Sequence, residues 1–148
     1  MNRKLPHTWA LPPTWLRFLV IVLLVLGVFF RFVNLDRKVY WFDEAFTSLR
    51  VSGYTEKEAI QEVCNGQEIG VEDLQKYQHL TPKKNLTDTI KSLIIEDPQH
   101  PPLYYVIARL WVQIFGSSVA VTRSLSSLIS LLVFPCIYWL CLELFHLS

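Results

Sequence analysis

Apolar and polar positions divide the chain into a charged middle between two apolar flanks. Residues 18–30 run without a polar interruption, and apolar neighbours extend this run to roughly the twenty positions that a bilayer-spanning helix needs. Residues 125–145 are long enough to cross as well, with Pro135 as a tolerated kink. Residues 103–115 are fewer and include Arg109, so this segment is predicted either to span or to lie along the interface.

The pattern predicts an all-α integral membrane protein with about three transmembrane helices. A helical extracytoplasmic loop is expected between the first and the second. The predicted segments are a cytoplasmic N-terminal tail (1–14), transmembrane helix 1 (15–35), the extracytoplasmic loop (36–100), transmembrane helix 2 (101–116), a cytoplasmic loop (117–124), transmembrane helix 3 (125–145) and a C-terminal end (146–148).

Lysine and arginine residues near the span ends set the predicted orientation. A cytoplasmic N-terminus is favoured by the bases before the first span and by Arg123, which is interpreted as a topology charge on the far side from the loop. The bases that follow the first span favour the opposite orientation, but the loop that they begin is about as long as the limit of this rule. A secretory signal is the alternative to the first span, although no small-residue cleavage site follows it.

The predicted loop is acidic and helical. Residues 36–100 contain twelve of the thirteen acidic and eight of the fourteen basic residues, so their net charge is near −4. Helices are predicted at 43–51, from Thr55 to Cys64, at 71–79 and at 86–96, with Gly53 ending the first. Thr55 and Glu58 have the spacing of a capping box. An acidic loop excludes nucleic acid as a partner, because phosphate backbones attract positive charge.

Two sequence features are expected to have no special role. The three cysteines form no disulfide framework, because two of them lie in an apolar helix and Cys64 has no partner in the loop. Residues 85–87 match the acceptor pattern for N-glycosylation, but such triplets are frequent by chance.

The adjacent carboxylates Asp43 and Glu44 are the first candidate site. They follow the aromatic residues 40–42, which would hold the backbone at the membrane interface. A carboxylate that is partly desolvated there has a raised pKa and becomes a useful general base. The alternative is a solvated pair that favours the helix dipole. Arg50 lies on about the same helical face as Asp43, so it is expected to pair with that carboxylate or to bind an anionic substrate.

The second candidate site lies where the loop meets the next apolar segment. Two prolines follow His100 and suit the first turn of a helix. His100 is interpreted as an interfacial histidine, or else as a metal ligand or phosphate contact. Glu96, Asp97 and His100 are candidate ligands of a divalent cation, although they match no standard ligand motif. Tyr104 is expected at the membrane–water interface, where tyrosine side chains are enriched.

Arg109 lies inside an apolar segment, where an unpaired charge is costly. The two interpretations, a contact to a substrate phosphate and a structural ion pair, are equally open.

In their order along the chain, these features resemble the N-terminal part of a known enzyme family. The features are Asp43-Glu44 after a first span, a helical outer loop, His100-Pro101-Pro102-Leu103-Tyr104-Tyr105 and Thr122-Arg123-Ser124-Leu125-Ser126. They resemble bacterial membrane glycosyltransferases of the GT-C fold, in particular the family 39 type, relatives of protein O-mannosyltransferases and lipid A aminoarabinose transferases. The resemblance covers nearly the whole chain.

The resemblance implies an enzyme of the bacterial inner membrane that transfers a sugar from a polyprenyl-phosphate donor to an extracytoplasmic acceptor. Asp43 would be the general base and Glu44 a supporting group, with inversion at the anomeric carbon. His100, Arg50, Arg109 and Tyr104 would bind substrate, and no cofactor is implied beyond the divalent cation considered above. Family members have many more spans, so the chain is expected to be a partial member with doubtful activity in isolation.

Two hypotheses from other functional classes are alternatives to the enzyme. One is a small non-enzymatic membrane protein whose outer loop binds a partner. The other, a transporter fragment, is disfavoured because no inverted repeat is visible. The sequence leaves the sugar, the acceptor and the oligomeric state open.

Overall fold

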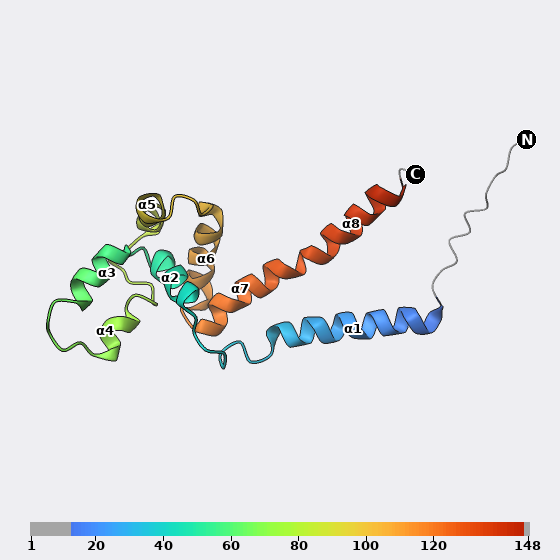
Figure 1. Cartoon of the computed structure of the whole chain (residues 1–148), viewed down its shortest axis with the longest axis horizontal. Helices are drawn as coiled ribbons and strands as arrows, with labels where there is room; N and C mark the ends of the chain where they lie inside the picture. Colours follow the sequence, from blue (N-terminus) through green and yellow to red (C-terminus); the bar gives the residue numbers. More distant parts are fainter. Residues whose placement is uncertain (1–12, 147–148) are drawn as a thin grey trace, which may run out of the picture. The chain divides into compact units, whose positions relative to one another are not determined.

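A computed structural model describes residues 13–146, and every regular element within that range is a helix. The chain divides into two compact units, residues 1–33 and 34–148. The helices are α1 (Thr14–Phe32), α2 (Phe42–Ser52), α3 (Glu56–Val63), α4 (Val71–Gln75), α5 (Leu86–Glu96), α6 (Pro102–Phe115), α7 (Val119–Leu131) and α8 (Val133–His146), labelled in Figure 1.

The first unit is helix α1. Its 19 residues rise about 28 Å at 1.5 Å per residue, close to the thickness of a bilayer's hydrocarbon core. None of its residues is buried, and it is apolar enough to cross a membrane. The first predicted span therefore forms a helix of suitable length and composition. Nearly all of the predicted N-terminal tail, including its bases Arg3 and Lys4, lies outside the described residues.

The second unit is built around α2, α5, α6 and α7, which pack on one another. Its small core consists of Val51, Ala108, Val112 and Leu125, and Trp111 packs against it. Because these residues come from three different helices, the core joins the outer loop to the last apolar segment.

The helices predicted in the loop are present, and local signals explain their ends. Helix α2 ends where Gly53 takes a left-handed conformation (φ 85°), which glycine adopts at little cost. Thr55 and Glu58 form the predicted capping box at the start of α3. Helix α5 has the predicted bounds, whereas α4 ends at Gln75 rather than near residue 79.

Helices α7 and α8 together form the second candidate span, Val119–Phe145, which is 27 residues long. The interruption at Leu132 has a local cause. Pro135 has no N–H to donate to the carbonyl of Leu131 and its ring disfavours an unbroken helix. The span contains the predicted segment 125–145 and begins six residues earlier.

Helix α6 does not fit the spanning alternative predicted for residues 103–115. It has 14 residues and rises about 21 Å, which is too short for a bilayer core. One face is buried against the unit through Ala108, Arg109 and Val112. Within the described residues, two helices rather than three are long and apolar enough to span. The predicted loop 117–124 is also shorter, because α7 begins at Val119.

Candidate functional site

A cavity of about 210 Å³ lies between the start of α2 and the first two turns of α7. It contains three of the predicted site residues and several hydroxyl groups. Its lining residues are Tyr40, Asp43, Glu44, Thr47, Tyr104, Val119, Thr122, Arg123 and Ser126. Since Val119–Ser126 begins the second candidate span, the cavity lies at one end of a helix that could cross a membrane.

Glu44 is held by Arg123. The Arg123 guanidinium donates two hydrogen bonds of 2.6 Å, from Nε to Glu44 Oε1 and from Nη2 to Oε2. Glu44 Oε2 also accepts the backbone N–H of Trp41 at 3.0 Å. Such a bidentate pair is among the stronger polar contacts in proteins. The hydrogen bond from Arg123 holds the pKa of the Glu44 carboxyl below its usual value. Glu44 is therefore a carboxylate committed to joining α2 to α7.

Arg123 also binds the segment that leads into α2. It donates to the backbone carbonyls of Leu35, Lys38 (3.2 Å) and Val39 (3.0 Å). The interpretation of Arg123 as a topology charge on the far side from the loop is wrong, because its guanidinium contacts Glu44 of that loop. Charge counting missed the role since it ignores partners that are distant in sequence. The one sequence feature that pointed to a role for Arg123 near the site was its place in the motif Thr122–Ser126, which belongs to the family resemblance.

The Asp43 carboxylate, unlike that of Glu44, is available to a ligand. Asp43 is the second residue of α2 and is exposed, and its carboxylate makes no hydrogen bond or ion pair with the described part of the chain. The side chains of Thr47 and Thr122 also line the cavity and bring hydroxyl groups to it. The hydroxyls of Tyr104 and Ser126, two further lining residues, share a hydrogen bond of 3.0 Å. Asp43 is thus an available proton acceptor among groups that can orient a polar ligand.

Tyr40 lines the cavity and binds the backbone of α2, a role that the sequence did not reveal. Its hydroxyl donates to the backbone carbonyl of Glu44 at 3.0 Å and shares a hydrogen bond with Ser48. Burial raises the pKa of this phenol above its ordinary value. The neutral side chain therefore stabilises the first turns of α2, where Asp43 and Glu44 lie.

Arg50 belongs to a separate cluster. It is 2% exposed, its Nε lies 2.7 Å from Asp97 Oδ2, and its Nη1 pairs with Glu96. Glu96 further accepts the backbone N–H groups of Glu56 (2.7 Å) and Lys57 (3.2 Å) at the start of α3. The predicted pairing of Arg50 with Asp43 is wrong, because the two acids at the end of α5 bind the guanidinium.

The proposed metal ligands do not form a metal site. In the described part of the chain, no three His, Cys, Asp or Glu residues are grouped closely enough to hold an ion. Glu96 and Asp97 are both bound to Arg50. His100 is exposed, and its backbone N–H donates to the Asp97 carbonyl. Its ring packs edge-on against Tyr105, with the two ring centroids 6.3 Å apart. His100 does not line the cavity that contains Asp43.

Arg109 matches neither of its two interpretations. It is 2% exposed and donates to the carbonyls of Val51 (2.7 Å) and Lys84 (2.6 Å) and to the Thr89 hydroxyl (3.0 Å). These partners are neutral, so the side chain makes neither an ion pair nor an accessible phosphate contact. Arg109 instead holds α6 against α2 and α5.

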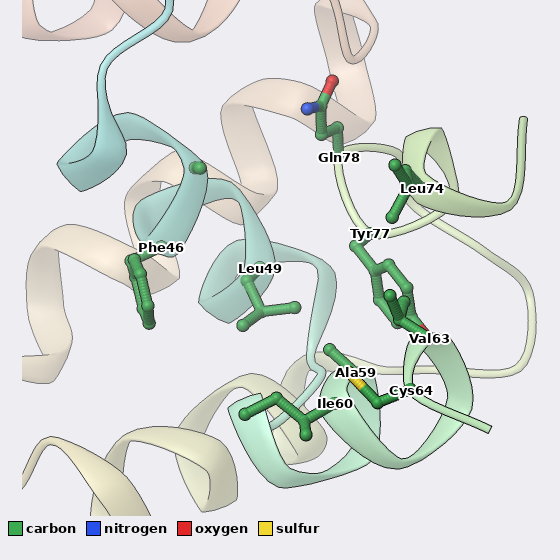
Figure 2. A pocket seen from close by; sticks show the side chains of 10 residues that line it. Phe46, Leu49, Ala59, Ile60, Val63, Cys64, Leu74, Tyr77 and Gln78 are labelled. Atoms are coloured by element: carbon green, nitrogen blue, oxygen red, sulfur yellow. The ribbon is translucent and has the colours of Figure 1, made fainter. Parts of the chain in front are cut away.

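A second hollow is an apolar groove on the other side of α2, with a volume of about 390 Å³. Figure 2 shows Phe46 and Leu49 of α2 together with lining side chains from α3 and from the segment that contains Leu74 and Tyr77. Cys64 also lines this groove as a free thiol. Helix α2 therefore presents carboxylates to one hollow and apolar side chains to another.

Comparisons with known proteins add no relative. No family model matches the chain, and the searches of curated proteins and of solved structures found no match. The functional argument therefore depends on the site and on the order of the sequence motifs.

Proposed function

We propose that the chain is a membrane glycosyltransferase, or the N-terminal portion of one, that transfers a sugar from a polyprenyl-phosphate donor to an extracytoplasmic acceptor. The observation that supports this most is the cavity in which Asp43 is uncommitted beside the Glu44–Arg123 pair. The sequence resemblance names the same acidic pair. A rigidly held helix start with one available carboxylate suits general base catalysis.

The location of the cavity supports a lipid-linked substrate. Residues from the first two turns of a candidate span line it, so a donor anchored in the bilayer would present its head group near Asp43. In this topology α1 and α7–α8 both cross the membrane. Residues 33–118 then lie outside the cytoplasm, and both chain ends lie on the cytoplasmic side of the bacterial inner membrane.

The proposed reaction is a direct displacement. Asp43 accepts the proton of the acceptor hydroxyl while that oxygen attacks the anomeric carbon of the sugar. The bond between this carbon and the donor phosphate oxygen breaks, and the polyprenyl phosphate leaves with the electron pair. Attack from the opposite face inverts the anomeric configuration. The hydroxyls of Tyr104, Thr122 and Ser126 line the cavity and orient the polar head group.

The role of Arg123 differs from that of a phosphate-binding arginine. Its guanidinium is engaged by Glu44 and by three carbonyls, so it positions the start of α2. Arg50 and Arg109 are buried away from the cavity and also engaged. In this proposal, the described hydroxyl groups contact the donor, and any cation that neutralises its phosphate lies elsewhere.

A transfer assay with membranes that contain the chain tests this proposal. A panel of radiolabelled polyprenyl-phosphate hexoses and pentoses is the donor, and label transferred to cell-envelope acceptors is measured. Asp43→Asn keeps the shape of the side chain but removes its basicity, so we expect transfer to fall by about 10² or more. Glu56→Gln, a first-turn acid of α3 outside the cavity, is the matched control and should keep full activity.

Equal transfer by the wild type and Asp43→Asn would overturn the catalytic assignment. Absence of transfer by the wild type with every donor, in membranes where the folded chain is demonstrated, would overturn the first form of the proposal, in which this chain is itself the enzyme.

A second candidate function is binding of a partner by the outer unit without catalysis. The apolar groove between α2, α3 and α4 favours it, because its size lies within the range of ligand pockets. The two candidates differ in which face of α2 matters. Ile60→Asp in the groove would impair the binding protein, whereas Asp43→Asn would impair the enzyme.

A further inference from the structure

Helix α6 carries an exposed apolar stripe. Leu103, Ile107, Leu110 and Ile114 follow one another at spacings of four, three and four residues, which places them on one helical face. Leu103 is 68% exposed and Ile114 is 73% exposed. Arg109 is the only charged residue of the helix and is buried, so no charged side chain of α6 interrupts this stripe.

The opposite face of α6 is fixed in the core. Ala108 and Val112 pack against Val51 and Leu125. Three hydrogen bonds from Arg109 tie the helix to α2, to α5 and to the segment before α5. Rotation of α6 about its axis would break these contacts, so the stripe cannot turn inward.

The stripe adjoins the candidate membrane span. Trp111 Nε1 donates to the Val121 carbonyl at 3.1 Å and to the Ser124 hydroxyl at 3.2 Å. Figure 1 shows α6 beside the first turns of α7, in agreement with these contacts. Further along α7 the side chains of Leu128 and Ile129 are also exposed, so apolar surface occurs on both packed helices.

From this arrangement we propose that α6 lies in the membrane–water interface, with its stripe in contact with the lipids of the leaflet that α7 enters. This inference rests on the proposed membrane location of the chain. A helix with one strongly apolar face and no exposed charge gains free energy at the acyl boundary. Its tyrosine and tryptophan side chains favour the same depth. Helix α6 is thus a membrane-surface helix that holds the cavity of Asp43 at lipid level.

Fluorescence quenching by lipid-borne spin labels tests this contact. Single cysteines at Leu103→Cys, Ile107→Cys and Ile114→Cys, each in the full chain with its three native cysteines replaced by serine, carry a bimane fluorophore. The chains are reconstituted in phosphatidylcholine–phosphatidylglycerol vesicles containing doxyl lipids. We expect the three labels to lose most of their fluorescence to the lipid quencher and little to aqueous iodide.

Two reference positions separate this inference from the membrane proposal. Native Cys141 of α8, kept as the single cysteine, reports whether the second candidate span is in lipid. Gln61→Cys on α3, an exposed polar position, should respond to iodide. Circular dichroism verifies that each variant keeps the helical content of the parent.

Each outcome decides one point. If Cys141 is quenched by lipid while the α6 labels respond only to iodide, the stripe faces water and the inference is wrong, although the span stands. Labels on α6 that neither quencher reaches would mean that polypeptide covers the stripe, which also overturns it. If lipid fails to quench Cys141, the membrane location itself fails.

Discussion

Two adjacent acidic pairs of the second unit, Asp43–Glu44 and Glu96–Asp97, are each contacted by an arginine, yet only one pair forms part of a candidate site. Arg50 binds both carboxylates of the second pair and is almost fully buried. Arg123 binds only Glu44 of the first pair. Asp43 is left with an available carboxylate at the edge of a cavity.

The difference shows how one motif serves two purposes. When an arginine engages both carboxylates of a pair, the acids stabilise the fold. When one carboxylate is fixed and its neighbour is available, the fixed group orients the helix start that carries the other. An acidic pair therefore indicates a site only when the partners of both its members are known.

The cluster of Arg50 is predicted to dominate stability. Arg50→Met removes one member of a largely buried network and leaves two carboxylates with reduced solvation. We expect the free energy of unfolding to fall by about 3 kcal/mol, as for other buried pairs broken on one side. Thermal unfolding in detergent, followed by circular dichroism, measures this loss. Arg37→Met, at an exposed arginine, is the control, and an equal effect of both changes would contradict the structural role of Arg50.

The contacts of Arg123 are predicted to have a smaller but more localised effect. Arg123→Met removes the bond to Glu44 and releases the carbonyls of residues 35–39, so we expect a loss of about 2 kcal/mol, typical of hydrogen bonds to charged groups. The linker before α2 should also become more accessible to trypsin at Arg37 and Lys38. Arg123→Lys keeps the charge without the planar fork and should give an intermediate cleavage rate. Unchanged cleavage in Arg123→Met would argue against the positioning role.

The pH dependence of stability sharpens the comparison for Glu44. Its pKa in the folded state is lowered, so its stabilising contribution is fully present above the unfolded pKa near 4.5 and is lost as the pH falls through the folded value. The melting temperatures of the wild type and Glu44→Gln should therefore differ at neutral pH and converge in acid. A difference that grows as the pH falls would contradict this assignment.

Tyr40→Phe is predicted to have the smallest effect. It removes the hydroxyl that bonds the Glu44 carbonyl and Ser48, and one such neutral contact contributes about 1 kcal/mol. A double-mutant cycle with Ser48→Ala isolates the contact from other effects of the two changes. Strict additivity of the two single changes would show that the hydroxyl pair contributes nothing to the start of α2.

Much of the fold was predictable because its signals are local. The capping box at Thr55 and the glycine at position 53 set helix ends through bonds within a few residues. The apolar runs gave the correct places of α1 and of the last candidate span. For the predicted transmembrane helix 2, hydropathy left two alternatives open, because it does not reveal that one face of α6 is buried in protein.

The candidate site was predictable only in part. Asp43, Glu44 and Tyr104, to which the resemblance assigns catalytic or substrate-binding roles, line one cavity. His100, Arg50 and Arg109 lie outside it, and Tyr40 and Arg123 were not expected in it. Spacing along one helix suggested Arg50 as the partner of Asp43, but the guanidinium is bound by acids 46 and 47 residues away.

By itself, the sequence determined most of the helices, several of their ends and the two segments suited to a bilayer, because these depend on caps, glycine conformations and hydropathy within short stretches. The tertiary structure decided which arginine meets which carboxylate. The Glu44–Arg123 pair joins residues separated by 79 positions, and only the packing of α2, α6 and α7 brings them together. Ion pairing acts over a few ångströms in space, so the position of a charge along the chain does not identify its partner.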